Sequence, residues 1–158
     1  MAEPIREQIL AAVKARAEGI TVAAGYRETV LRVTRALEYL DQQNELPILI
    51  VLPANEENEK RYDELGDGLI DATMGVEVVL FAEGTSSVGL STTIERLVAD
   101  VEQALTTPDL RLGLTAIGVY DVQDTGRFSI EYIASADWLR GAAAVVYRIA
   151  YSYARGAP

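Results

Sequence analysis

The chain has 158 residues, of which 24 are acidic and 14 basic, and its formal net charge at pH 7 is −10. It contains no histidine and no cysteine, which excludes Ser-His-Asp and Cys-His catalysis, thiol chemistry and histidine-ligated metal sites. Proteins bind nucleic acid mainly through Lys and Arg, so a chain this acidic is a poor candidate for a nucleic-acid-binding protein. With 49% hydrophobic residues and no apolar run near the roughly 20 residues that span a bilayer, we expect a single folded domain over residues 1–158 and no membrane partner.

The first half of the chain predicts one helix and several strands. Apolar residues recur at helical spacing over residues 4–18, and Gly19 is well suited to end that helix. Alternation predicts a strand over residues 29–39, although a helical turn fits this stretch equally well. The apolar run 46–52 predicts a strand that is covered on both faces, and alternation returns over residues 73–81.

Residues 54–68 are rich in charge and lack apolar periodicity, so we expect a long charged loop inside the domain. A loop of this length in a compact domain is usually functional or disordered. We therefore treat it as a candidate interface loop. Its candidate residues are Glu56, Glu57, Glu59, Lys60, Arg61, Tyr62, Asp63 and Glu64.

The clearest helix signal covers residues 92–105, where the large apolar residues form one stripe. Thr92 followed by Glu95 resembles a capping box, and Pro108 disfavours helical geometry just before it. The Gly/Ser/Thr-rich residues 84–91 are expected to form a linker into this helix.

Beyond Pro108 we expect strands over residues 114–122, 128–134 and 142–153, with a turn at residues 124–126 between the first two. The predicted order is α-β-β-β-α-β-β-β. Short connections between successive strands favour a mostly antiparallel, possibly mixed, sheet with two amphipathic helices packed on it, which is an α+β fold.

Four residues near the end of the chain are candidate subunit-interface anchors, because Trp, Tyr and Arg are enriched at interface hot spots. Trp138 equally fits a side chain folded over the core edge. The tyrosine row of the last strand equally fits a half-buried sheet face. The candidates are Trp138, Arg140, Tyr151 and Tyr153.

Catalytic signatures are missing from the sequence. The stretch 63–68 resembles the start of a calcium loop, but Leu65 and Met74 occupy positions where that loop needs oxygen ligands. Neither a phosphate-binding loop nor a nucleophile elbow is present. We therefore predict no enzyme activity, no cofactor, and no catalytic, cofactor-binding or metal-binding residues.

The overall layout supports a family resemblance. Its parts are an N-terminal helix ending near Gly19, the strand 46–53, the helix 94–105, the residues 108–110 and 113–114, and the aliphatic and aromatic strand 146–153. In this order the chain resembles the tail terminator and tail-completion proteins of long-tailed bacteriophages.

The resemblance implies a structural protein of the virion, assembled in the host cytoplasm. Such proteins form a closed ring, typically a hexamer, at the head-proximal end of the tail tube. The ring ends tail polymerisation and prepares the tail for joining to the head. The implied partners are further copies of the chain, the tail tube protein and the head–tail connector protein, while DNA passes through without being specifically bound. On this resemblance, some of residues 54–68 would face the central channel or the tail tube.

Three alternatives stay open at this point. A head–tail connector or neck subunit would share the size and the ring habit. A small-molecule-binding regulatory α+β domain would need a defined apolar pocket. A metal-dependent hydrolase would use the carboxylates within residues 56–71.

Overall fold

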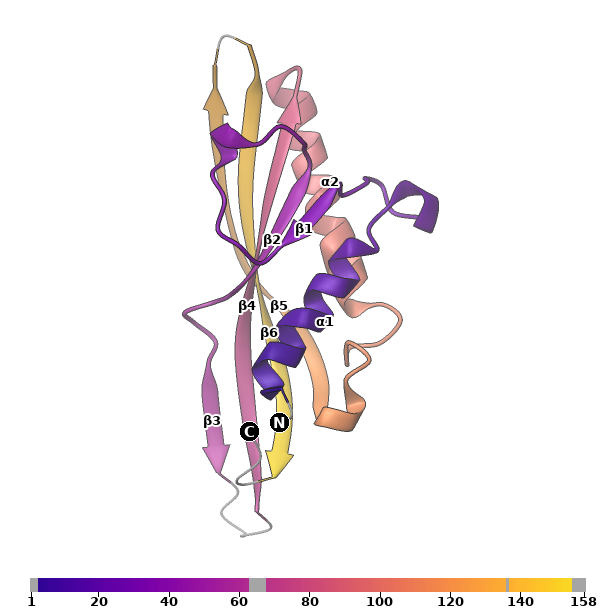
Figure 1. Ribbon diagram of the computed structural model, residues 1–158, viewed down its shortest axis with the longest axis vertical. Helices are drawn as coiled ribbons and strands as arrows, with labels where there is room; N and C mark the ends of the chain where they lie inside the picture. Colours follow the sequence, from indigo (N-terminus) through magenta and orange to yellow (C-terminus); the bar gives the residue numbers. More distant parts are fainter. Residues whose placement is uncertain (1–2, 63–67, 136, 155–158) are drawn as a thin grey trace.

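The computed structural model describes residues 3–62, 68–135 and 137–154. Two helices, α1 (Ile5–Glu18) and α2 (Ser87–Thr106), pack on one face of a six-stranded sheet (Figure 1). The strands are β1 (Arg32–Thr34), β2 (Ile48–Pro53), β3 (Glu59–Tyr62), β4 (Leu69–Gly84), β5 (Val119–Ala134) and β6 (Leu139–Ala154). Short 3-10 helices lie at Val22–Ala24, Leu40–Gln42 and Thr115–Ile117.

The predicted fold class is confirmed. The strand order in the sheet is β1-β2-β4-β6-β5, with β3 also paired to β4. The β1–β2 pair is parallel and the other pairs are antiparallel. A helix, a block of strands, a second helix and a second block of strands follow one another as expected, with four described strands before α2 and two after it.

The central helix begins earlier than its apolar stripe indicated. The side chain of Ser86 accepts a hydrogen bond from the backbone N–H of Gly89 at 3.1 Å, which caps the helix at Ser87. The predicted linker is therefore largely helical. Thr92 forms no capping box, because its hydroxyl donates to the carbonyl of Val88 at 2.9 Å inside the helix. The buried stripe contains the predicted Ile94, Leu97, Val101 and Leu105, and Leu90, which lies in the expected linker, extends it.

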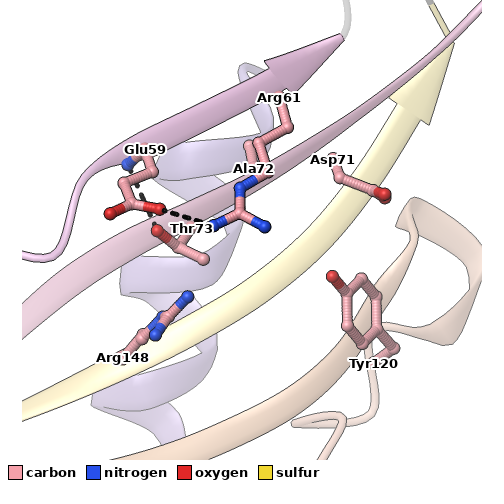
Figure 2. A pocket seen from close by; sticks show the side chains of 7 residues that line it. All are labelled: Glu59, Arg61, Asp71, Ala72, Thr73, Tyr120 and Arg148. Carbon is pink, nitrogen blue, oxygen red and sulfur yellow. Dashed lines mark hydrogen bonds and ion pairs between the residues drawn. The ribbon is translucent and has the colours of Figure 1, made fainter. Parts of the chain in front are cut away.

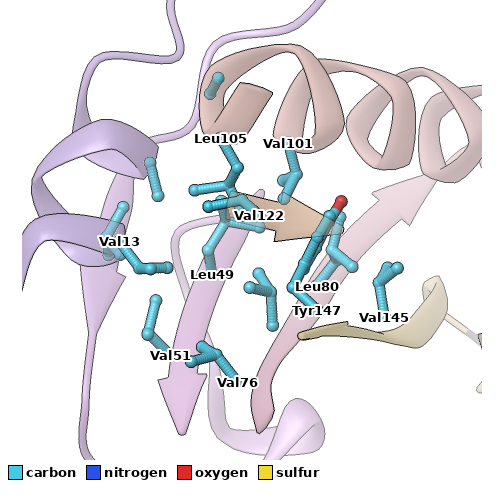
Figure 3. Packing of buried hydrophobic residues seen from close by; sticks show 14 of the residues in the cluster. Val13, Leu49, Val51, Val76, Leu80, Val101, Leu105, Val122, Val145 and Tyr147 are labelled. Carbon is cyan, nitrogen blue, oxygen red and sulfur yellow. The ribbon is translucent and has the colours of Figure 1, made fainter. Parts of the chain in front are cut away.

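Apolar side chains are buried on both faces of the sheet. The larger cluster lies between the sheet and the helices, where alternate residues of β4 and β6 meet α1 and α2 (Figure 3). A smaller cluster on the opposite face joins Leu40, Ile48, Ile50 and Phe81. The β2 strand is thus covered on both faces, as its continuous apolar run predicts.

The expected loop over residues 54–68 is wrong for residues 59–62, whereas residues 54–58 are irregular as expected. Residues 59–62 form β3, which pairs with β4 from Thr73 to Ile70. Residues 54–58 form a bulge between β2 and β3, and its backbone passes directly over Gly75. A Cβ at this glycine would lie 2.1 Å from the carbonyl oxygen of Glu56, so the close approach requires glycine.

The predicted turn at residues 124–126 is also wrong. The β5 strand continues through it, with a register shift between Asp124 and Phe128, because β6 offers a partner along the whole length. The hairpin instead turns after Ala134, where the N–H of Ser135 donates to the carbonyl of Trp138 at 2.9 Å. The first expected strand was likewise too long, since only Arg32–Thr34 pairs with β2.

Candidate assembly surfaces

Ion pairs connect the bulge over Gly75 to β5, the strand at one edge of the sheet. Arg127, in the irregular part of β5, forms ion pairs with Glu56 and with Glu57, the latter at 3.7 Å. Asn58 closes the bulge internally, donating from Nδ2 to the carbonyls of Ala54 and Glu56 at 2.9 Å each. Two of the predicted loop residues therefore hold the bulge against the sheet.

The other predicted loop residues lie on or beyond β3. Glu59, Lys60 and Arg61 are exposed, and β3 runs beside the start of β4 at the end of the sheet opposite the β5–β6 turn (Figure 1). Tyr62 is the last residue of β3, paired with Ile70 in the register. Asp63 and Glu64 lie outside the described residues.

A hollow of about 130 Å³ opens beside β3 on the sheet face away from the helices (Figure 2). Arg61 of β3 and Arg148 of β6 face it together with two carboxylates, Glu59 and Asp71. Because the two positive and two negative groups balance, the hollow carries no net charge that would select an ion. Arg61 Nη2 lies 3.7 Å from Glu59 Oε2, and Tyr120 of β5 lines one side of the hollow.

The sequence did not identify Asp71, Tyr120 or Arg148 as neighbours of the charged stretch. Their side chains meet only because β3, β4 and β6 pair in one specific register, in which Arg148 lies opposite Gly75. Alternation within each strand indicates which face a residue occupies, but it does not indicate which residue of another strand lies beside it.

Trp138 and Arg140 lie in contact, but Arg140 is largely occupied within the chain. Its Nε donates to Glu83 at 2.8 Å, its Nη1 donates to the carbonyl of Leu40 at 2.9 Å, and it is only 8% exposed. Its guanidinium carbon lies 4.5 Å from the centre of the Trp138 ring, a cation–π contact. The role of this pair at a subunit interface stays a prediction.

Tyr151 and Tyr153 lie on the sheet face that the helices cover. Tyr151 is 2% exposed within the main core, and Tyr153 is half-buried against it. Their rings stack with centroids 5.8 Å apart. In the single chain their side chains stabilise the core, and an interface role for them is also still a prediction.

The sequence did not identify an exposed apolar row on a strand edge. Phe128, Ile130 and Tyr132 of β5 are 39 to 47% exposed and alternate along one face of the strand. Alternation did predict a strand here, but only the sheet order shows that this strand lies at the edge.

Within residues 3–62, 68–135 and 137–154, no group of three or more His, Cys, Asp or Glu side chains is placed to hold a metal ion. None of the helices described is long and apolar enough to cross a membrane.

The molecule therefore has a two-layer α+β fold whose notable surfaces are strand edges and a short charged hairpin. No protein-family model matches the sequence, and no curated protein matches it. Among solved structures, the chain is similar to a chain of the virion of a native gene transfer agent (GTA) particle. The TM-score is 0.61 at 18% sequence identity, and the match covers 96% of this chain and 100% of the other. At this identity the likeness shows a shared fold.

Proposed function

We propose that this chain is a structural protein of a phage-like virion. The observation that carries the proposal is the whole-chain fold match to a component of a gene transfer agent virion, which leaves almost no part of either chain unmatched. A structural role also agrees with the sequence, which lacks histidine and cysteine and carries no recognisable catalytic motif.

The finer proposal is that copies of the chain form a ring, with six subunits expected, at the head-proximal end of the tail tube. This step is supported by the resemblance of the sequence layout to tail terminator proteins. A head-to-tail contact between identical subunits closes into a ring when its rotation permits. In that position the ring would stop tube growth and contact the head–tail connector protein.

The charge of the chain agrees with such a ring. Each subunit contributes a formal charge of −10, so a channel lined by several copies would repel the phosphate backbone of DNA and let it slide. The exposed β3 end of the sheet is our candidate for the surface that meets the tube or the channel. Lys60 and Arg61 supply positive charge there, next to Glu59.

The decisive experiment is tube polymerisation in vitro, with a tail tube protein from the same phage-like particle. We expect the purified chain to shorten the tubes, and a gold label on the chain to mark one end of each tube. A chain that leaves tube length unchanged and instead binds the connector ring is a connector subunit. A chain that does neither overturns the proposal.

A pair of charge-reversal variants tests the β3 surface. Lys60→Glu changes an exposed position on β3, whereas Arg111→Glu makes the same change in charge on the exposed segment after α2. We expect Lys60→Glu to weaken tube capping and Arg111→Glu to leave it unchanged. Equal behaviour of the two variants would exclude β3 as the contact surface.

A further inference from the structure

The upper half of β5 has the features of a docking strand. Residues 128–134 pair in regular register with residues 139–145 of β6. In the part of the chain that the structure describes, β5 ends the strand order, and no strand pairs with its other side. The backbone groups on that side are therefore available to an added strand.

The lower half of β5 carries the usual protection of a sheet edge, and the upper half does not. Register shifts interrupt the strand between Val119 and Asp121 and between Asp124 and Phe128, and charged side chains flank both shifts. Bulges and charges of this kind discourage edge-to-edge pairing. From Phe128 to Ala134 the strand is regular, and Glu131 is its single charged residue.

The upper half also carries an apolar row next to that free edge. Phe128, Ile130 and Tyr132 share the face that β5 turns toward α2, yet they extend beyond the helix and are 39 to 47% exposed. Ser129 and Glu131 point to the opposite face, since side chains alternate along a strand. Such a row is expected to be covered by apolar groups of a partner.

The order of these residues is self-complementary. If two copies of the strand run antiparallel about a two-fold axis at Ile130, Phe128 of each copy lies opposite Tyr132 of the other and the two Ile130 side chains meet. On the opposite face Ser129 meets Glu131, so no like charges are opposed. A register centred on Glu131 would oppose two carboxylates, and one centred on Ser129 would pair only residues 128–130 of the regular stretch, against residues 128–132 for the axis at Ile130.

We propose that β5 binds β5 of a second copy of this chain, antiparallel and centred on Ile130, to form one continuous sheet across a dimer. In a two-fold contact the same surface of both copies meets, so that surface must be complementary to itself. The order of residues 128–132 meets this requirement. The contact closes at two copies, so it is separate from the contact that would build a ring. The inference therefore stands independently of the proposed function.

The first test is the mass of the purified chain, measured by light scattering after size exclusion over a range of concentrations. For the chain alone, without the tail tube at whose end the ring is proposed to form, we expect a species of about twice the 17.2 kDa chain mass. Ile130→Lys places two positive charges on the axis and should give monomers. Tyr120→Lys is the matched control, because Tyr120 is similarly exposed, at 49%, but lies beside the first register shift. A monomeric wild type, or an oligomer whose mass Ile130→Lys does not change, overturns the proposal.

Substitutions at Ser129 test the register without touching the apolar row. Ser129→Glu would oppose Glu131 of the second copy with a like charge, and Ser129→Lys would oppose it with an opposite charge. We expect the first to weaken the dimer and the second to tighten it, each by about threefold to tenfold in Kd, because every dimer contains the pair twice. Effects of the same sign in both variants contradict the register.

A single introduced cysteine gives an independent readout, because the natural chain contains none. Ile130→Cys would place two thiols across the axis, where two-electron oxidation by added oxidised glutathione joins them in a disulfide and releases reduced glutathione. Directly opposed strand residues lie near the Cβ separation that a disulfide needs. We expect Ile130→Cys to form covalent dimers much faster than Tyr120→Cys. Equal rates overturn the proposal.

Discussion

The two long strands β5 and β6 are neighbours of equal length that have opposite environments. Each has 16 residues, and they pair along almost their whole length. In β6, Val145, Tyr147 and Ile149 are at most 2% exposed, because β4 and β5 flank the strand and the helices cover one face. In β5, most residues beyond Val122 are exposed. Sequence and position both contribute to this difference, because β6 is largely apolar with two charged residues, whereas β5 has four charged residues and lies at the edge of the sheet.

The largest contrast between the strands is expected from truncating an isoleucine in each. Ile149 in β6 is fully buried, and Ile149→Ala should lower the free energy of unfolding by about 2–5 kcal/mol because it leaves a cavity. Ile130 in β5 is 39% exposed, and Ile130→Ala should cost about 1 kcal/mol or less. Urea unfolding followed by fluorescence of Trp138 measures both. Equal costs would contradict the contrast.

Two glycines with positive φ test how closely the strands approach each other. Gly118 has φ +85°, and a Cβ there would lie 1.9 Å from the carbonyl oxygen of Ser152 at the end of β6. Gly126 has φ +70° and open space around it. We expect Gly126→Ala to cost about 1 kcal/mol through backbone strain, and Gly118→Ala about 1–3 kcal/mol more through the clash. Thermal unfolding compares them, and a smaller loss for Gly118→Ala would be the contrary result.

A buried polar atom in β6 reduces the stability that this strand gains from its burial. The hydroxyl of Tyr147 is buried without a hydrogen-bond partner among the described residues, and Figure 3 shows it among apolar side chains under α2. Tyr147→Phe removes an unsatisfied group and should stabilise the fold by about 1 kcal/mol. Chemical denaturation at neutral pH measures this gain, and a loss of stability would mean that the hydroxyl has a partner.

The same tyrosine predicts a pH dependence. Burial, followed by the charges of Asp124 and Glu102, raises the pKa of Tyr147 above its ordinary value of 10.0. The folded chain therefore keeps the proton above pH 10 while the unfolded chain releases it, so stability falls as the pH rises through this range. Tyr147→Phe lacks this loss, and its advantage over the wild type should grow above pH 10. A constant advantage would contradict the raised pKa.

The smallest effect is expected outside both strands, in the turn after α2. The backbone N–H of Arg111, at 2.7 Å, together with the N–H of Gly113 and the guanidinium of Arg16, lowers the pKa of Asp109 below its ordinary value of 3.8. The carboxylate stabilises the fold above that pH, and the contribution is lost as the pH falls through the lowered pKa. Asp109→Ala should be slightly less stable than the wild type at pH 7, and the difference should vanish in acid. A difference that persists at pH 2 would contradict this assignment.

The helices and the interior strands could be predicted because their periodicity is strong. The stripe of α2 and the two-sided burial of β2 both follow from the spacing of apolar residues. The start of α2 was missed because Ser86 is one of several small polar residues that could cap it. The β3 strand was missed because its residues are charged, and only pairing with β4 makes them a strand.

The candidate surfaces were predicted less well than the fold. Arg140 and Trp138 were identified by residue type and do meet, but Glu83 and the carbonyl of Leu40 already occupy Arg140. Glu56 is paired with Arg127, which lies 71 positions further along the chain. Residue type indicates what a side chain is able to bind. It does not show which groups reach it once distant strands have paired.

The sequence by itself determined the chemistry that is excluded, the charge of the surface, and the apolar faces of the helices and strands. These follow from residue types and from the fixed geometry of each element. Only the tertiary structure decided which strand lies at the edge, which half of β5 stays unprotected, and why Gly75 must lack a side chain. The reason is physical, because an alternating segment has the same pattern in the centre of a sheet and at its edge, and long-range pairing alone distinguishes the two.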